Sequence, residues 1–175
     1  HLCQHSCLIA PGRSGLCGVR ENREGTLVSE VYGYPIAEAC DPIEKKPLYH
    51  FLPGTRAYSI STCGCNFHCL NCQNSTISQA PAPDLIAALP FRDPSEIAAE
   101  AESQGCASIA HTYTEPTVFY EYAHAIAIAA RERGIRTVFV TNGYISEIAL
   151  RHIATLLDAV NIDLKFFDDD LYRRV

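Results

Sequence analysis

The sequence predicts an α/β protein, with a partial (β/α) TIM-like barrel that follows an irregular, cysteine-containing N-terminal lobe. Two observations predict this fold. From residue 55 onward, short apolar or β-branched segments alternate with helical ones over short links, which is typical of a parallel sheet with right-handed crossovers. Residues 1–54 show little periodicity and are punctuated by glycine and proline. We therefore expect an accessory lobe at 1–54 and the barrel at 55–175.

The first elements are short. The lobe is expected to contain a hairpin near Thr26–Tyr34. Ala57–Thr62 predicts a strand that runs into a cysteine-rich loop, and a proline-rich connector follows at Ala80–Asp84.

The next helix carries clear end signals. Asp93 can cap it, Pro94 suits its first turn, Glu96 can complete a capping box and Gly105 ends it. The later elements are a buried strand at Ala107–Thr112, an alanine-rich helix at Thr117–Arg133, a β-branched strand at Thr137–Thr141, a helix at Ser146–Leu157 and a strand at Ala159–Leu164.

Four strands and three helices end at Val175, where another helix would begin. A half sheet leaves an edge to cover, so we expect a barrel truncated after about four strands, with later units outside this chain. Because the sequence contains no methionine, His1 is not expected to be a translation start.

Composition argues against several classes of protein. The net charge of −6 is spread without long runs, whereas nucleic-acid phosphates demand a basic surface. No apolar stretch approaches the roughly 20 residues of a membrane span, and no signal peptide is visible. Nine cysteines, an odd number, fit metal binding better than a secreted disulfide scaffold. We therefore expect a reducing, cytoplasmic location.

Three of the cysteines lie within the segment CNFHCLNC, residues 65–72. A disulfide between such close neighbours would close a strained loop and leave one thiol over. A structural zinc site needs four ligands, which Cys63 or His68 could complete. Three thiolates could instead hold a cubane cluster and leave one iron open. The loop follows the first parallel strand, on the face where such barrels carry active sites, which favours the cluster.

Read with its neighbours as GCNFHCLNCQN, this motif resembles that of the radical S-adenosylmethionine (SAM) enzymes, in which Cys-x3-Cys-x2-Cys follows the first strand. Other segments are similar to the radical SAM enzymes of the AmmeMemoRadiSam system, relatives of the pyruvate formate-lyase (glycyl radical) activating enzymes. These segments are CQHSC…GLCGVREN, DPIEKKPLYHFLPGT, TYTEPTVFYEYA, FVTNGY and NIDLKFF. The resemblance spans essentially the whole chain and implies a longer natural protein.

The resemblance implies that Cys65, Cys69 and Cys72 ligate a [4Fe–4S] cluster whose fourth iron is chelated by SAM. An electron from the cluster then breaks the C5′–S bond, which gives methionine and a 5′-deoxyadenosyl radical that abstracts hydrogen. The relatives suggest a protein backbone glycine as the target, by analogy. A low-potential flavodoxin or ferredoxin would supply the electron.

The resemblance also assigns residues to SAM, and each has a structural alternative. Those residues are Phe67 near adenine (or core packing), Glu115 for the SAM ammonium (or a helix N-terminal acid), Asn142 for ribose or methionine groups (or turn chemistry with Gly143), and Asp163 with Lys165 near the SAM carboxylate (or a mutual salt bridge). Asn71, Gln73 and Asn74 could donate to cluster sulfurs or cap the loop. At the second strand, Tyr113 and Thr114 stand where many relatives carry two glycines.

Other polar residues are less clearly placed. His111 faces opposite to Thr112 and is expected to be a satisfied core histidine. Lys45 and His50, in IEKKPLYHF, face the site or brace the lobe against the barrel. The front cysteines have metal-like spacing and are expected to hold a second, structural metal, with free thiols as the alternative; they are Cys3, Cys7 and Cys17, with His5 between the first two.

Two other functions compete with the enzyme. An electron-transfer or metal-binding module would hold a cluster without SAM chemistry, and such carriers normally bind all four irons through protein ligands. Cys63 could supply that fourth ligand. The second competing function is that of a zinc scaffold.

Overall fold

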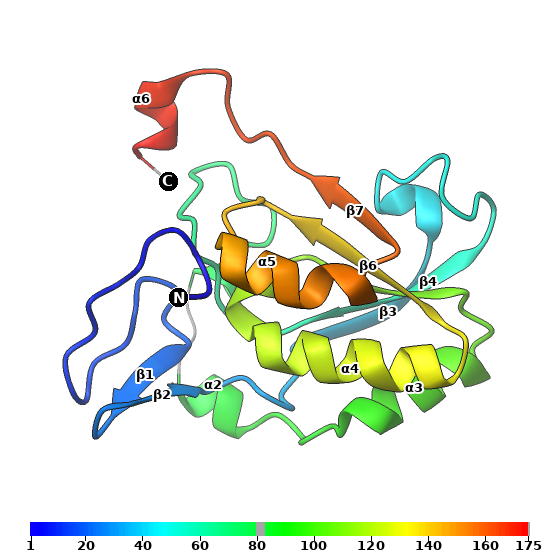
Figure 1. Cartoon of the computed structure of the whole chain (residues 1–175), viewed down its shortest axis with the longest axis horizontal. Helices are drawn as coiled ribbons and strands as arrows, with labels where there is room; N and C mark the ends of the chain where they lie inside the picture. The colour runs from blue at the N-terminus through cyan, green and yellow to red at the C-terminus, as the bar shows by residue number, and fades with distance from the viewer. Residues whose placement is uncertain (80–82, 175) are drawn as a thin grey trace.

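The computed structural model describes residues 1–79 and 83–174, which form a five-stranded sheet, a separate hairpin and a layer of helices (Figure 1). The strand order is β3-β4-β5-β6-β7, and every neighbouring pair from β4 to β7 is parallel. The predicted α/β class and parallel sheet are confirmed. Truncation of the barrel stays a prediction.

The four predicted barrel strands form close to their expected positions. They are β4 (Arg56–Ser61), β5 (Ser108–His111), β6 (Arg136–Thr141) and β7 (Ala159–Ile162). The sequence analysis missed β3 (Ala37–Pro42), which pairs antiparallel with β4. Its sequence, AEACDP, has no β-branched or aromatic residue, so only the pairing identifies it as a strand. β3 lies in the range that we assigned to the lobe, and the division at residue 54 stays a prediction.

The three longest helices pack against one face of the sheet (Figure 1). α3 (Pro94–Ser103) has the predicted capping box, because Asp93 accepts from the backbone of Ser95 and Glu96 accepts from the backbone of Asp93, each at 2.9 Å. Each of the two later helices includes a 3₁₀ turn. The elements are η2 (Pro116–Phe119), α4 (Tyr120–Glu132), α5 (Glu147–Ile153) and η3 (Ala154–Leu156).

The predicted hairpin is real but lies earlier in the chain. It consists of β1 (Arg20–Arg23) and β2 (Thr26–Ser29), so Thr26 begins its second strand rather than its first. Residues 80–82 of the predicted connector lie outside the described residues, and α2 (Pro83–Ala87) follows them. The other short elements are η1 (Ile43–Lys45), α1 (Ser75–Ser78) and α6 (Asp169–Tyr172).

The two faces of the sheet carry different residues because side chains alternate along each strand. On the helix side, Tyr58, Ile60 and Ile109 join a cluster with residues of α3 and α4. On the other side, the small residues Ala57 and Ala110 meet Ile43 and other apolar groups. At the carboxyl ends of the parallel strands, this second face leads to the loops that follow each strand.

No helix in the described ranges is long and apolar enough to cross a membrane.

His111 lies on the helix side of β5, fully buried between the rings of Phe119 and Phe139. Its core location was predicted. The expectation that it is satisfied is wrong, because neither ring nitrogen has a hydrogen-bond partner in the part of the chain that the structure describes. Burial lowers the pKa of His111 to about 3 from an ordinary value of 6.5, since the charged form would lack solvation.

A lowered histidine pKa makes the fold acid-sensitive. The stability that neutral His111 contributes is complete above pH 6.5 and is lost as the pH falls toward 3. When the pH falls from 7 to 4, we expect the unfolding free energy of the wild type to fall by about 3 kcal/mol more than that of His111→Leu. Urea titrations at the two pH values measure this difference, and parallel losses in both proteins would contradict it.

Candidate functional site

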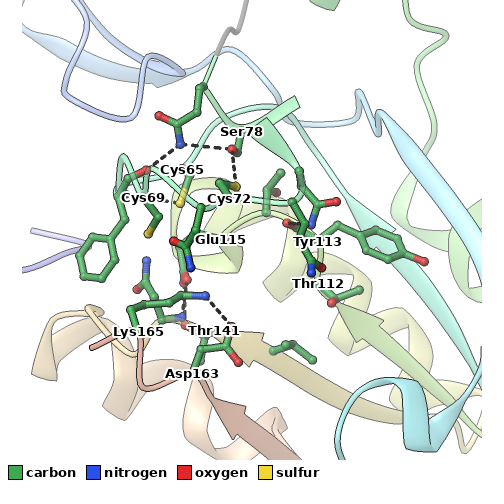
Figure 2. A pocket seen from close by; sticks show the side chains of 18 of the residues that line it. Cys65, Cys69, Cys72, Ser78, Thr112, Tyr113, Glu115, Thr141, Asp163 and Lys165 are labelled. Atoms are coloured by element: carbon green, nitrogen blue, oxygen red, sulfur yellow. Dashed lines mark hydrogen bonds and ion pairs between the residues drawn. The ribbon is translucent and has the colours of Figure 1, made fainter. Parts of the chain in front are cut away.

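A cavity of about 580 Å³ lies where the parallel strands end (Figure 2). The loops after β4, β5, β6 and β7 all contribute to its lining, because the carboxyl ends of parallel strands meet at one edge of a sheet. The cavity brings together all the residues predicted for the site. They are Cys65, Phe67, Cys69, Cys72, Glu115, Asn142, Asp163 and Lys165.

The three cysteines project into this cavity from the loop after β4. The Phe67 amide donates to Cys65 Sγ at 3.4 Å, and Cys72 Sγ lies 3.3 Å from Ser78 Oγ. Burial raises the pKa of the Cys65 thiol to about 12, and it raises that of Cys69 as well. Metal binding would therefore have to displace protons from these thiols.

The donor set fits a cluster with one open position better than a closed zinc site. Cys63 is fully buried in the apolar core with Val19 and Phe119 and does not line the cavity. His68 is exposed, hydrogen-bonded to Gln79 at 2.5 Å, and does not line it either. Neither residue that could complete a zinc site therefore joins the three thiols.

No three His, Cys, Asp or Glu side chains within residues 1–79 and 83–174 approach closely enough to hold a single metal ion. A [4Fe–4S] cluster does not require that approach, because each cysteine binds a different iron. The lack of a single-ion site therefore does not exclude a cluster, and the ligand role of the three cysteines stays a prediction.

Glu115 is buried at the end of β5, and it joins that strand to β6. One carboxylate oxygen accepts from the backbone and hydroxyl of Thr117 and from Thr141 Oγ1, while the other accepts from the Asn142 amide at 2.8 Å. The helix-capping alternative is therefore present in the structure. Burial nevertheless raises the pKa of Glu115 above its ordinary value. A contact with SAM stays a prediction.

Asn142 makes the turn contacts that were its structural alternative. Its Oδ1 accepts from the Tyr144 amide at 2.9 Å, and its Nδ2 donates to Asn66 Oδ1 at 2.7 Å. The second contact links the loop after β6 to the cysteine loop. Asn142 therefore fixes the two loops relative to each other.

Asp163 and Lys165 form the mutual salt bridge, at 2.7 Å, while both line the cavity (Figure 2). Burial alone would lower the pKa of Lys165, but the hydrogen bond and charge of Asp163 and the nearby Cys69 and Cys65 raise it. Lys165 is thus a firmly charged group on the cysteine side of the cavity.

Phe67 is buried within a group of rings that contains His5, Tyr144 and Tyr172. Core packing accounts for this position, and part of Phe67 still lines the cavity. Its predicted role beside adenine is compatible with this placement and stays a prediction.

The front cysteines line a second, much smaller cavity of about 30 Å³. They do not converge on one point within the described ranges, so the positions of Cys3, Cys7 and Cys17 do not support a second metal. His5 is engaged elsewhere, since its Nε2 lies 2.8 Å from the Asn66 carbonyl. Burial raises the pKa of Cys17.

The sequence analysis missed several residues of the site region, and Lys46 and Asp41 are two of them. Lys46 lines the cavity beside Lys45, and Asp41 accepts hydrogen bonds from both of them. The segment DPIEKK contained a signal, because Asp41 precedes Lys45 by four residues across a proline turn. His50 is exposed and does not line the cavity.

Gly64 connects the cysteine loop to the N-terminal segment. Its φ is +93°, and a Cβ at this position would lie 2.7 Å from Val19 Cγ1 and 2.8 Å from the Cys17 carbonyl oxygen. Both the backbone conformation and the close approach therefore require glycine. The positive φ of Gly64 lies between Cys63, which is in the core, and Cys65, which lines the cavity.

Two comparisons with known proteins bear on this site. A family model described as "Radical SAM superfamily" matches residues 59–175. The chain is also 47% identical, over 177 residues and its whole length, to "Uncharacterized protein MJ0808" of Methanocaldococcus jannaschii, of which it covers 51%. The chain thus spans about half the length of the curated relative it matches.

Replacing Gly64 with alanine is expected to disturb the cysteine loop. Strain at positive φ and overlap with the Cys17 carbonyl should lower the unfolding free energy by about 2 kcal/mol or more and reduce iron bound after anaerobic reconstitution. Urea unfolding and iron analysis measure the two effects.

The matched control is Gly54→Ala. Gly54 has φ +78°, but a Cβ there would meet nothing within 4 Å. It should show the smaller stability loss and normal iron content. Equal iron loss in both variants would show that the close approach at Gly64 is unimportant.

Proposed function

The chain belongs to the radical SAM superfamily, and from that premise we propose that it cleaves S-adenosylmethionine reductively on a [4Fe–4S] cluster held by Cys65, Cys69 and Cys72. One observation carries the proposal: these thiols line a single cavity with the residues predicted for SAM, while Cys63 is sealed in the core. When bound, the cluster supplies the electron that splits SAM into methionine and a 5′-deoxyadenosyl radical.

Hydrogen bonds hold the cysteine loop in place around this cavity. Asn74 donates to the Tyr113 carbonyl at 2.8 Å, and Gln79 donates to the Phe67 carbonyl at 2.9 Å. Ser78 places its hydroxyl beside Cys72 Sγ. A hydroxyl that donates to a ligand sulfur raises a cluster's reduction potential, so we assign Ser78 a tuning role.

The charged residues divide the recognition of SAM between them. We assign the ammonium of SAM to Asp163, whose carboxylate contacts Lys165 alone among the described side chains, because Glu115 already accepts four hydrogen bonds from its own chain. Lys165 then serves the SAM carboxylate through a charge-assisted hydrogen bond. Glu115 and Asn142 support this edge of the pocket, and Phe67 offers a ring face to adenine.

The finer assignment rests on the family-like segments of the sequence. We propose that the protein is a radical SAM enzyme of the AmmeMemoRadiSam type, related to the glycyl-radical activating enzymes. The radical would abstract hydrogen from a partner molecule, with a backbone glycine of a protein as one target. A low-potential flavodoxin or ferredoxin in the cytoplasm would supply electrons.

An electron-transfer module is less well supported. Such a module normally binds every iron through protein ligands, and Cys63 was the candidate for the fourth. Its burial among apolar side chains, with a pKa raised by desolvation, places it outside the cavity. The three-thiol set therefore favours an open coordination position and SAM chemistry.

Anaerobic reconstitution with iron and sulfide tests the proposal. We expect about four irons per chain and, with a reductant and SAM, formation of 5′-deoxyadenosine detected by chromatography and mass spectrometry. Changing any one of Cys65, Cys69 or Cys72 to alanine should abolish the product, because each removes a cluster ligand.

Cys63→Ala is the matched control, since it removes a neighbouring thiol that does not line the cavity. It should retain both iron and product. A reduced cluster that yields no 5′-deoxyadenosine would contradict the enzyme proposal and support the electron-transfer alternative, and zinc in place of iron would contradict both.

A further inference from the structure

The cavity wall opposite the cysteines carries a pair of lysines. Figure 2 shows Tyr113 and Thr112 across the cavity from Cys65 and Cys69. Lys45 and Lys46, which follow β3, line the cavity on the Tyr113 side, and Lys46 Nζ lies 4.6 Å from the centre of the Tyr113 ring. The Lys46 side chain is only 2% exposed, whereas that of Lys45 is 64% exposed.

Asp41 holds both lysines in place. Its Oδ1 accepts from Lys45 at 2.9 Å and its Oδ2 from Lys46 at 2.8 Å, with further bonds from Ser59 and Tyr113. Burial opposes the ionisation of Asp41, but its hydrogen bonds, led by that from Lys46, hold the pKa of this carboxyl well below its usual value. Two lysines thus share one carboxylate, and although burial lowers the pKa of Lys46, the hydrogen bond and charge of Asp41 counter that shift. With both lysines protonated, the three side chains carry a net positive charge.

Tyr113 adopts a backbone conformation that tyrosine rarely takes. Its φ is +65°, in the region that favours glycine. The strained residue makes specific contacts, because its hydroxyl donates to Asp41 at 2.5 Å and its ring faces Lys46. Strain of this kind persists where the surrounding structure holds a functional group in position. The contacts fix Lys46 before any ligand arrives.

We propose that Lys45 and Lys46 bind an anionic group of the substrate, a carboxylate or a phosphate, so that the target in this cavity is an anionic small molecule rather than the backbone glycine of a protein. This inference rests on the proposed function, because it names the substrate class of the same site. Each ammonium has three N–H donors, and the single Asp41 carboxylate cannot neutralise both lysines. A second anion would balance the charge, and the rigid Lys46 lowers the entropy lost on binding.

The position of the lysine pair separates it from the residues assigned to SAM. The charges of Lys165 and Asp163 both act on the pKa of Cys69. Lys45 and Lys46 instead contact Asp41, and Lys46 also lies against the Tyr113 ring. An anionic group bound by the lysines would therefore direct the rest of the substrate across the cavity, toward the cysteine side.

Calorimetric titration of inorganic pyrophosphate or succinate into the reconstituted, SAM-saturated protein tests this proposal. The two probes distinguish phosphate from carboxylate. We expect saturable binding of at least one probe, weakened about tenfold in Lys45→Gln through loss of one charged hydrogen bond, and largely restored in Lys45→Arg. Lys45 is chosen because its exposed side chain can be changed while Asp41 keeps three donors.

Arg13→Gln is the matched control, because Arg13 is exposed and does not line the cavity. It should bind the probe like the wild type. Failure of the wild type to bind either probe, or equal binding by Lys45→Gln, would overturn the proposal. Loss of probe binding when SAM is added would also overturn it, since the lysines would then serve the carboxylate of SAM.

The 5′-deoxyadenosine assay on the same samples separates this inference from the proposed function. Probe binding that depends on Lys45, without cleavage of SAM, would remove the proposed function and keep the anion site. Cleavage of SAM without probe binding would keep the proposed function and remove the anion site.

Discussion

Parallel pairing of β4, β5, β6 and β7 is the constraint on which the rest of the structure depends. It brings four loops, which are far apart in sequence, to one edge of the sheet. The helices cover the other face with large apolar groups, whereas the cavity side carries small residues such as Ala57 and Ala110.

Polar contacts between the loops then define the cavity. Glu115 joins the end of β5 to the start of the loop after β6, and Asn142 joins that loop to the cysteine loop through Asn66. Asn74 completes the connection by donating to the Tyr113 carbonyl. These contacts pair polar groups that are buried or partly buried, so they hold the loops in fixed positions relative to one another.

The two sides of the cavity are suited to different chemistry. The cysteine side offers soft sulfur donors and the Asp163–Lys165 pair, which suits a cluster and a zwitterionic cofactor. The opposite side offers a net positive charge held by Asp41 and Tyr113. In a cavity with this division, the proposed cofactor and the proposed anionic substrate would each bind at its own end.

Local sequence by itself determined the alternation of strands and helices, the Asp93 cap and the cysteine spacing, because period, capping and ligand spacing act over a few residues. The tertiary structure alone decided three further points. β3 exists through its pairing with β4, and Tyr113 meets Asp41 across 72 positions. Cys63 and Cys65 would share a face if the strand continued, but Gly64, with φ +93° and packed against Val19, leaves Cys63 in the core and Cys65 in the cavity. Such contacts depend on segments distant in the chain, which no local pattern specifies.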